Sequence, residues 1–162
     1  MVIIGVDPGT ARLGWGVVKN DKGQQTVGSY GCLETKKEKT DAVRLKELFD
    51  QFIKLLKKFK PDAVAVEDLF FFKNQKTIVK VSQARGVILL ASQLQNIPTF
   101  SYSPPQIKLA VTGYGQADKH QVQQMTKTIL KLSSIPKPDD TADALAVALT
   151  HAFTNKMKTK LK

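Results

Sequence analysis

Residues 2–10 read VIIGVDPGT, and this stretch decides the fold. The run from Val2 to Val6 is short, apolar and rich in β-branched residues, which is typical of a buried central strand. Asp7 follows directly, and Pro8-Gly9 then break the strand, because proline lacks a backbone donor and glycine permits a tight turn. An acidic side chain is therefore expected at the point where a buried strand ends.

The remaining apolar patterns predict further strands, which then alternate with helices. Strands are expected at residues 14–18, 25–34, 63–66 and 97–100, with a hairpin turn at Asp21-Lys22-Gly23. Helices are expected at residues 40–58, 75–95, 118–132 and 139–153, with a short one from Pro104. This order indicates an α/β domain with a mixed sheet, part antiparallel and part parallel. We predict a single domain over residues 1–154 and a basic, flexible tail over residues 155–162.

Basic side chains dominate the middle of the chain. The 162 residues hold 25 Lys and Arg against 14 Asp and Glu, which gives a net charge of +11. Residues 1–68 carry twelve basic and ten acidic side chains, whereas residues 69–138 carry nine basic side chains and one acid, Asp118. A long stretch with a single carboxylate is expected of a surface that meets a polyanion such as a nucleic acid. Composition alone leaves open that the surface is basic without such a partner.

Composition also limits the cellular compartments in which the protein is expected. The longest apolar runs, such as Ala144 to Leu149, are too short to span a bilayer, and the first residues do not resemble a secretory signal. Cys32 is the only cysteine, so neither an internal disulfide nor a thiolate metal cluster can form, which fits a reducing environment. No segment is typical of a basic amphipathic helix with aromatic anchors. We expect a cytoplasmic protein with no membrane partner.

Four carboxylates stand where a divalent cation could bind. Asp7 follows one predicted strand and Glu67 follows another, so both emerge at the same edge if the two strands are parallel neighbours. Asp140 and Asp143 lie three residues apart at the start of a predicted helix, on one face and near its positive end. Four such groups repel one another unless some take up protons or a cation lies between them. Oxygen ligands favour Mg²⁺ or Mn²⁺, and two such ions about 4 Å apart are typical of a phosphodiester-cleaving site.

Each of these carboxylates also has a structural interpretation. Asp7, before proline and glycine, could form a turn, and Glu67 could be a surface residue at a strand end. Asp139 or Asp140 could cap the last helix, a role that we assign to Asp139. We favour the metal site because all four carboxylates occur together in a basic protein.

Four short motifs follow one another along almost the whole chain. They are Ile4-Gly5-Val6-Asp7-Pro8-Gly9-Thr10, Val66-Glu67-Asp68-Leu69-Phe70, Gln83-Ala84-Arg85-Gly86 and Asp140-Thr141-Ala142-Asp143-Ala144-Leu145-Ala146. In this order they resemble the RuvC family of Holliday junction resolvases. The first motif alone is unspecific, because sugar kinases and actin-like ATPases begin similarly. The resemblance implies a homodimer and a ribonuclease-H-like α/β fold, in which a mixed five-stranded sheet is flanked by helices.

The resemblance also implies roles for individual residues. It matches the family's metal-binding catalytic carboxylates, which hold two Mg²⁺ ions that Mn²⁺ can replace, to Asp7, Glu67, Asp140 and Asp143. It matches the functional lysines beside the scissile phosphate to Lys108 and Lys119, and the aromatic that contacts junction bases to Phe70. Lys73 and Arg85 are further candidate DNA contacts. Some relatives carry histidine where this chain has Asp140, so that position could tune the second metal.

Two further features favour contacts outside one monomer. Phe70, Phe71 and Phe72 are adjacent and cannot all face one core, so at least one ring should be exposed. Stacking of a base on an exposed ring contributes ~1–3 kcal/mol. Gly86 interrupts the predicted helix 75–95 at a cost of ~1 kcal/mol against alanine. We therefore expect a close helix–helix approach at Gly86, across the dimer.

The resemblance implies an Mg²⁺-dependent endonuclease that makes paired, symmetric nicks in four-way DNA junctions. Its products carry a 5′-phosphate and a 3′-hydroxyl, it acts in recombination and repair, and a branch-migration motor is a candidate partner. Two rival functions stay open. A non-catalytic junction-binding protein of the same fold would bind DNA without metal and leave it uncut. An actin-like nucleotide phosphotransferase would need two related domains, for which 162 residues are too few.

Overall fold

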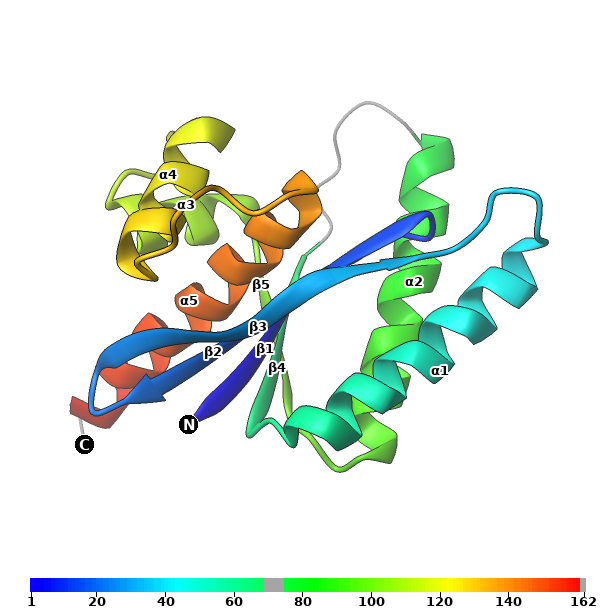
Figure 1. Cartoon of the computed structure of the whole chain (residues 1–162), viewed down its shortest axis with the longest axis horizontal. Coiled ribbons are helices and arrows are strands. Elements are labelled where there is room, and N and C mark those ends of the chain that lie inside the picture. Colours follow the sequence, from blue (N-terminus) through cyan, green and yellow to red (C-terminus); the bar gives the residue numbers. More distant parts are fainter. Residues whose placement is uncertain (69–74, 161–162) are drawn as a thin grey trace.

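The computed structural model describes the backbone of residues 1–68 and 75–160 and the side chains of residues 1–68 and 78–154. Its strands are β1 (Val2–Asp7), β2 (Arg12–Asp21), β3 (Gln24–Glu34), β4 (Ala63–Glu67) and β5 (Thr99–Tyr102). Its helices are α1 (Asp41–Phe59), α2 (Gln75–Leu94), α3 (Pro104–Thr112), α4 (Lys119–Ile129) and α5 (Asp139–Lys160) (Figure 1). The elements follow the predicted order.

The five strands form one mixed sheet in the order β3-β2-β1-β4-β5. β1, β2 and β3 pair antiparallel, whereas β1, β4 and β5 run parallel. The turn between β2 and β3 is Lys22-Gly23, whose φ angles of 46° and 92° suit a two-residue hairpin. β1 lies at the centre, and its Ile3, Ile4 and Val6 are fully buried. The prediction of a mixed five-stranded sheet flanked by helices is therefore confirmed.

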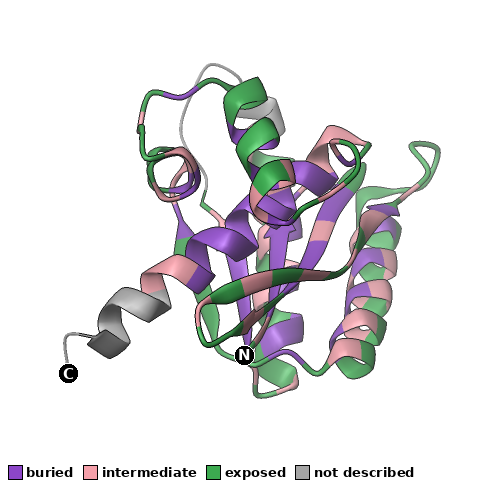
Figure 2. Ribbon diagram, turned by 60° about the vertical axis from the view of Figure 1, so that its left-hand side comes forward, coloured by how far each residue is buried: buried purple, intermediate pink, exposed green. Residues whose placement is uncertain are grey.

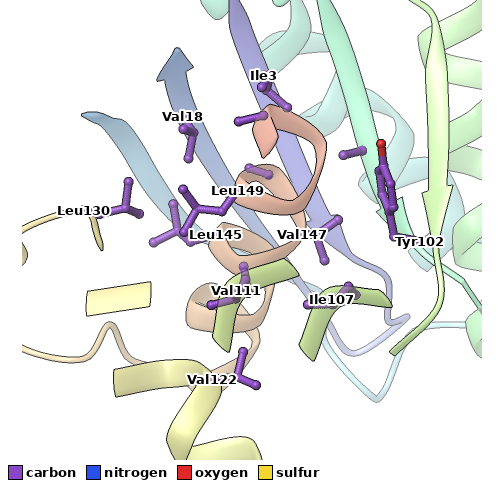
Figure 3. Packing of buried hydrophobic residues seen from close by; sticks show 14 of the residues in the cluster. Ile3, Val18, Tyr102, Ile107, Val111, Val122, Leu130, Leu145, Val147 and Leu149 are labelled. Atoms are coloured by element: carbon purple, nitrogen blue, oxygen red, sulfur yellow. The ribbon is translucent and has the colours of Figure 1, made fainter. Parts of the chain in front are cut away.

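Helices cover both faces of the sheet (Figure 1). Because side chains alternate along a strand, Ile4 joins the core under α1 and α2, while Ile3 joins the core under α5. α3 and α4 contact α5 and enclose this second core from outside, as Figure 3 shows for Ile107, Val111 and Val122. Figure 2 shows the described part of α5 as mostly buried between these layers, whereas α1 presents an exposed face to solvent.

Glycines on the sheet let α5 approach very closely. A Cβ added at Gly5 of β1 would stand 2.1 Å from the carbonyl oxygen of Ala144 and 2.6 Å from the backbone nitrogen of Ala148. A Cβ added at Gly14 of β2 would stand 2.0 Å from the carbonyl oxygen of Asp140. Real side-chain atoms do not occupy such positions, so the position of α5 on the sheet depends on these two glycines.

Some element boundaries differ from the predictions. β2 is longer than residues 14–18 because it pairs with β3 from Arg12 to Asp21. α4 ends at Ile129, before the predicted residue 132, since the chain turns at Lys131, whose φ is 53°. α5 continues to Lys160 instead of ending at residue 153. Whether residues 155–162 form a flexible tail stays a prediction.

Gly86 lies on an exposed face of α2. Within the described residues no atom lies within 4 Å of the position that its Cβ would take. The close helix–helix approach expected there is thus not made within the described part of one monomer. In that part of the chain, no helix is both long and apolar enough to cross a membrane.

Candidate active site

The carboxyl ends of two neighbouring parallel strands bring Asp7 and Glu67 to one edge of the sheet. Val6 of β1 is in register with Val66 of β4, so the next residue on each strand is one of these two acids. Both strands are apolar up to that point, because they are buried under helices on both faces. The predicted convergence of these two carboxylates therefore follows directly from the parallel pairing.

The start of α5 supplies the other two carboxylates. Gly14, which is paired with Asp7 across the sheet, lies directly under the backbone of Asp140. Asp143 follows one turn later on the same side of the helix. α5 begins at Asp139 itself, so this residue is the first of the helix instead of its predicted N-cap, and its side chain accepts a hydrogen bond from Lys137 at 2.7 Å.

The charges of the other three carboxylates all act on Asp7. Burial, followed by the charges of Glu67, Asp143 and Asp140, raises the pKa of Asp7 to about 8. Burial and the charge of Asp143 raise the pKa of Glu67 to about 7, although Lys119 and a hydrogen bond with Asp7 act in the opposite direction. Asp7 and Glu67 are therefore harder to ionise than exposed carboxyl groups, first because they are buried and then because negative charges lie near them. A positive charge near Asp7 and Glu67 would favour their ionised forms.

Lys119 is a cation in direct contact with this cluster. Asp118 caps α4 in a reciprocal arrangement with Gln121, which places Lys119 in the first helical position. Its Nζ lies 2.8 Å from Oδ2 of Asp143 and 3.9 Å from Oδ2 of Asp139. Burial lowers the pKa of Lys119, but the hydrogen bond and charge of Asp143 outweigh burial and raise it overall. Lys119 therefore stays charged at the edge of the acidic cluster.

A hollow of about 200 Å³ opens beside the carboxylates. Its polar lining consists of Glu67, Asp143, Lys108 and Lys119. Apolar walls come from α3, α4 and α5. The two lysines predicted to lie beside the scissile phosphate thus share one hollow with two of the four acids, and this hollow can take a group that carries negative charge.

The donor set has the chemistry that a hard divalent cation requires. All four acids offer oxygen ligands, which Mg²⁺ prefers, and a cation among them would offset their mutual repulsion. Within residues 1–68 and 78–154, no three His, Cys, Asp or Glu side chains already stand in a metal-binding arrangement. Lys119 instead contacts Asp143, and Arg12 lies 3.7 Å from Oδ2 of Asp140. Coordination would therefore require these side chains to reorient on the backbone that carries them.

The candidate DNA contacts are placed only in part. Arg85 of α2 donates a hydrogen bond to Oγ of Ser101 at 2.6 Å and lies 3.3 Å from Oδ1 of Asp68. It therefore joins α2 to the strand ends beside Glu67. Phe70, Phe71, Phe72 and Lys73 lie outside the described residues.

Sequence reasoning missed Arg12, the residue next to Asp140. A single arginine just after a predicted turn is usually a solvated surface residue, so neither the type nor the spacing of Arg12 indicates a functional role. The signal that could have found it is its position five residues after Asp7, as the first residue of β2, the strand that begins at the acidic edge.

The stability of the metal-free protein is expected to fall as the pH rises from about 4 to 8. The folded pKa of Asp7 is about 8 against an ordinary value of 3.8, so in this interval the folded state holds a proton that the unfolded state has lost. The stabilisation by this proton is present at low pH and is lost as the pH approaches the folded pKa. Asparagine does not titrate, so Asp7→Asn should avoid this loss. The free energy of unfolding of the variant, relative to that of the wild type, should be more favourable at pH 8 than at pH 5 by a few kcal/mol. Melting temperatures of both proteins, measured in EDTA from pH 5 to 9, test this.

The matched control for the pH series is Asp50→Asn, which removes an exposed carboxylate paired with Lys46 on α1. Its melting curve should follow the wild type at every pH. If Asp7→Asn also ran parallel to the wild type, Asp7 would have an ordinary pKa and the carboxylates would not be crowded.

The sheet order and the acidic edge define a class, the ribonuclease-H-like proteins. The yeast mitochondrial Holliday junction resolvase shares this fold with a TM-score of 0.67 over 97% of this chain and 82% of that chain, at 14% sequence identity. The RuvC structure of Thermus thermophilus in complex with Holliday junction substrate is more similar, with a TM-score of 0.92, 37% identity, and coverage of 98% and 97% of the two chains. Crossover junction endodeoxyribonuclease RuvC of Fusobacterium nucleatum is 52% identical over 93% of this chain and 80% of its own length. The family model of crossover junction endodeoxyribonuclease RuvC matches residues 3–151, and the chain belongs to this family.

Proposed function

We propose that this protein is an endonuclease that resolves four-way DNA junctions by paired, symmetric nicks. The observation that carries the proposal is the convergence of Asp7, Glu67, Asp140 and Asp143 beside a lysine-lined hollow. Buried carboxylates with raised pKa values occur at functional sites more often than elsewhere. The family membership of the chain supports the choice of substrate, since its relatives are crossover junction endodeoxyribonucleases.

The four carboxylates would hold Mg²⁺, with two ions in each active site, and Mn²⁺ would substitute. When bound, such ions supply an activated water and stabilise the leaving 3′-oxygen, so the products would carry a 5′-phosphate and a 3′-hydroxyl. Lys119 and Lys108 face the same hollow and would stabilise the charge that develops on the attacked phosphate. Ile107, Val122 and Ala146 form apolar walls of this hollow.

Two copies of this chain would act on the two-fold symmetric junction. A stripe on α2 with helical spacing stays exposed and consists of Val79, Gln83, Gly86, Leu90 and Leu94. Three of its members are large apolar residues more than half exposed, and the open Gly86 at its centre allows another helix to approach closely. We assign this stripe to the interface with a second copy, because an interface of this kind relates identical surfaces by a two-fold axis.

Leu90→Lys should convert the dimer to a monomer. A charge at the centre of an apolar interface must be desolvated, which weakens the dimer at least about tenfold. Sedimentation velocity over a range of protein concentrations measures the change. Met125→Lys alters an exposed apolar residue of α4, on the other side of the sheet, and should leave the dimer intact. If both variants had the same monomer–dimer equilibrium, the stripe on α2 would not form the dimer interface.

Recognition would depend on junction shape and on the basic surface more than on base edges. Affinity should therefore fall steeply with salt. We expect the protein to act in recombination and repair in the cytoplasm, with a branch-migration motor as a partner. Phe70, Lys73 and Arg85 stay candidate DNA contacts.

The experiment that tests the proposed function uses a synthetic mobile four-way junction and a linear duplex of the same sequence. The protein is incubated with each in Mg²⁺ or in EDTA, and the strands are resolved on a denaturing gel. Paired nicks in the junction alone, and only with Mg²⁺, are expected. Tight binding without nicks would instead support a non-catalytic junction-binding protein.

A further inference from the structure

A second hollow, of about 400 Å³, lies on the far side of Asp140. It is bounded by the turn between β1 and β2, by α2 and by the start of α5, and its lining includes Gly9, Arg12, Lys80 and Asp140. Figure 1 shows the tip of the β1–β2 hairpin beside α2, which brings these distant segments together. The hollow does not share Glu67, Asp143, Lys108 or Lys119 with the first one.

Two cations line the second hollow, and both are available to a further anion. The Arg12 side chain is 53% exposed, and its Nε lies 3.7 Å from Oδ2 of Asp140. The Lys80 side chain is 49% exposed, and its Nζ lies 3.3 Å from Oδ1 of Asp41. Ion pairs this exposed contribute little to stability, so either cation can exchange its partner at low cost. Lys80 does not pair with Asp140, so its presence is not explained by neutralisation of the acidic cluster.

Each hollow contains part of the acidic cluster. Asp140 lines one and Asp143 lines the other, and these residues are one helical turn apart on α5. A DNA strand carries a phosphate at every nucleotide, so a strand with its scissile phosphate at the carboxylates places further phosphates on either side. Lys108 and Lys119 line the first hollow and not the second, so they reach the scissile phosphate from one side. Arg12 and Lys80 offer the matching charge on the other.

We propose that the second hollow binds a backbone phosphate of the cleaved strand, through Arg12 and Lys80, on the side of the cut opposite Lys108 and Lys119. Arginine suits this role because its planar guanidinium can donate two parallel hydrogen bonds to one phosphate. The inference rests on the proposed nuclease function and adds the second half of the path that the strand follows. It makes Arg12 and Lys80 positioning residues that fix which phosphate meets the carboxylates.

The first test measures junction binding in EDTA, where no cleavage occurs. Arg12→Gln and Lys80→Gln should each reduce the slope of log affinity against log salt by about 0.9, the value for one lost phosphate contact. Arg12→Lys should retain most of the slope because it keeps the charge. The matched controls are Lys57→Gln and Lys60→Gln, since these lysines line a third hollow at the opposite end of the sheet. Equal losses in all four glutamine variants would overturn the proposal.

The second test locates the contact on the DNA. Junctions that carry a single neutral methylphosphonate are prepared, with the neutral position moved one nucleotide at a time across the cut. Neutralising the contacted phosphate should weaken binding to the wild type but should not weaken it further in the Arg12→Gln/Lys80→Gln double variant. Such coupling is expected on one side of the cut only. Equal penalties for wild type and double variant at every position would overturn the inference.

The outcomes also separate this inference from the proposed function. If the wild type cuts the junction but no phosphate couples to Arg12 and Lys80, only the second hollow loses its role. If the wild type neither binds the junction in preference to duplex DNA nor cuts it, both proposals fail.

Discussion

Asp7→Asn should leave a four-way junction bound but uncut. Asp7 lies at the centre of the acidic cluster, where Glu67, Asp140 and Asp143 all act on it. Asparagine has nearly the same size but offers one neutral oxygen, so the cluster would lose a charged ligand for the proposed cations. Bound cations contribute several kcal/mol to stabilisation of the transition state, so cleavage should fall about 10³-fold or more. Single-turnover cleavage and gel-shift titration on the same junction give the two quantities.

Junction affinity separates a lost catalytic ligand from a misfolded protein. It should stay within about threefold of the wild type, because removal of one negative charge does not weaken binding to a polyanion. Asp50→Asn, on the exposed face of α1, should retain full cleavage. If Asp7→Asn cleaved the junction at more than a tenth of the wild-type rate, Asp7 would not be a ligand of the proposed metal site.

Gly5→Ala should produce the largest loss of stability of any single methyl addition proposed here. The new Cβ would stand 2.1 Å from the carbonyl oxygen of Ala144, and the obstructing atoms belong to the backbone of a buried helix. They cannot move aside unless α5 lifts from the sheet. We expect a cost of about 3 kcal/mol or more, which corresponds to a drop in melting temperature of about 10 °C. Thermal denaturation followed by circular dichroism measures the drop.

Gly115→Ala is the matched control for this substitution. Within the described residues, only the carbonyl oxygen of Pro105, at 4.0 Å, lies near the position of its added Cβ, which is ordinary contact. Its melting temperature should therefore equal or slightly exceed that of the wild type. A drop of similar size in both variants would mean that glycine loss itself, and not the packing of α5, destabilises the protein.

The fold could be predicted from the sequence where apolar runs end sharply. Val2 to Val6 forms the central strand because β-branched residues are followed by Asp7 and Pro8. The predicted boundaries were wrong where pairing with a distant part of the chain sets the length of an element. β2 reaches from Arg12 to Asp21 because β3 supplies a partner along its whole length, and no local signal carries that information.

The candidate site, too, could be predicted only in part from the sequence. The positions of Asp7 and Glu67 follow from two strands that run parallel, and that of Asp143 follows from helical spacing. Nothing in the residues alone separates Lys119 from a solvated lysine, so its place beside Asp143 was expected only through the family resemblance. Arg12 was missed because its proximity to Asp140 depends on how α5 lies across the hairpin.

Because glycines of the sheet contact α5 directly, the position of the acidic residues on α5 does not depend on the length of the connection that precedes this helix. The register of the helix is set by Gly5 against Ala144 and by Gly14 against Asp140, and not by the connection at residues 130–138. One residue inserted between Asp140 and Ala144 would instead rotate Asp140 by roughly 100° about the helix axis, and the acidic edge would come apart while the fold survived.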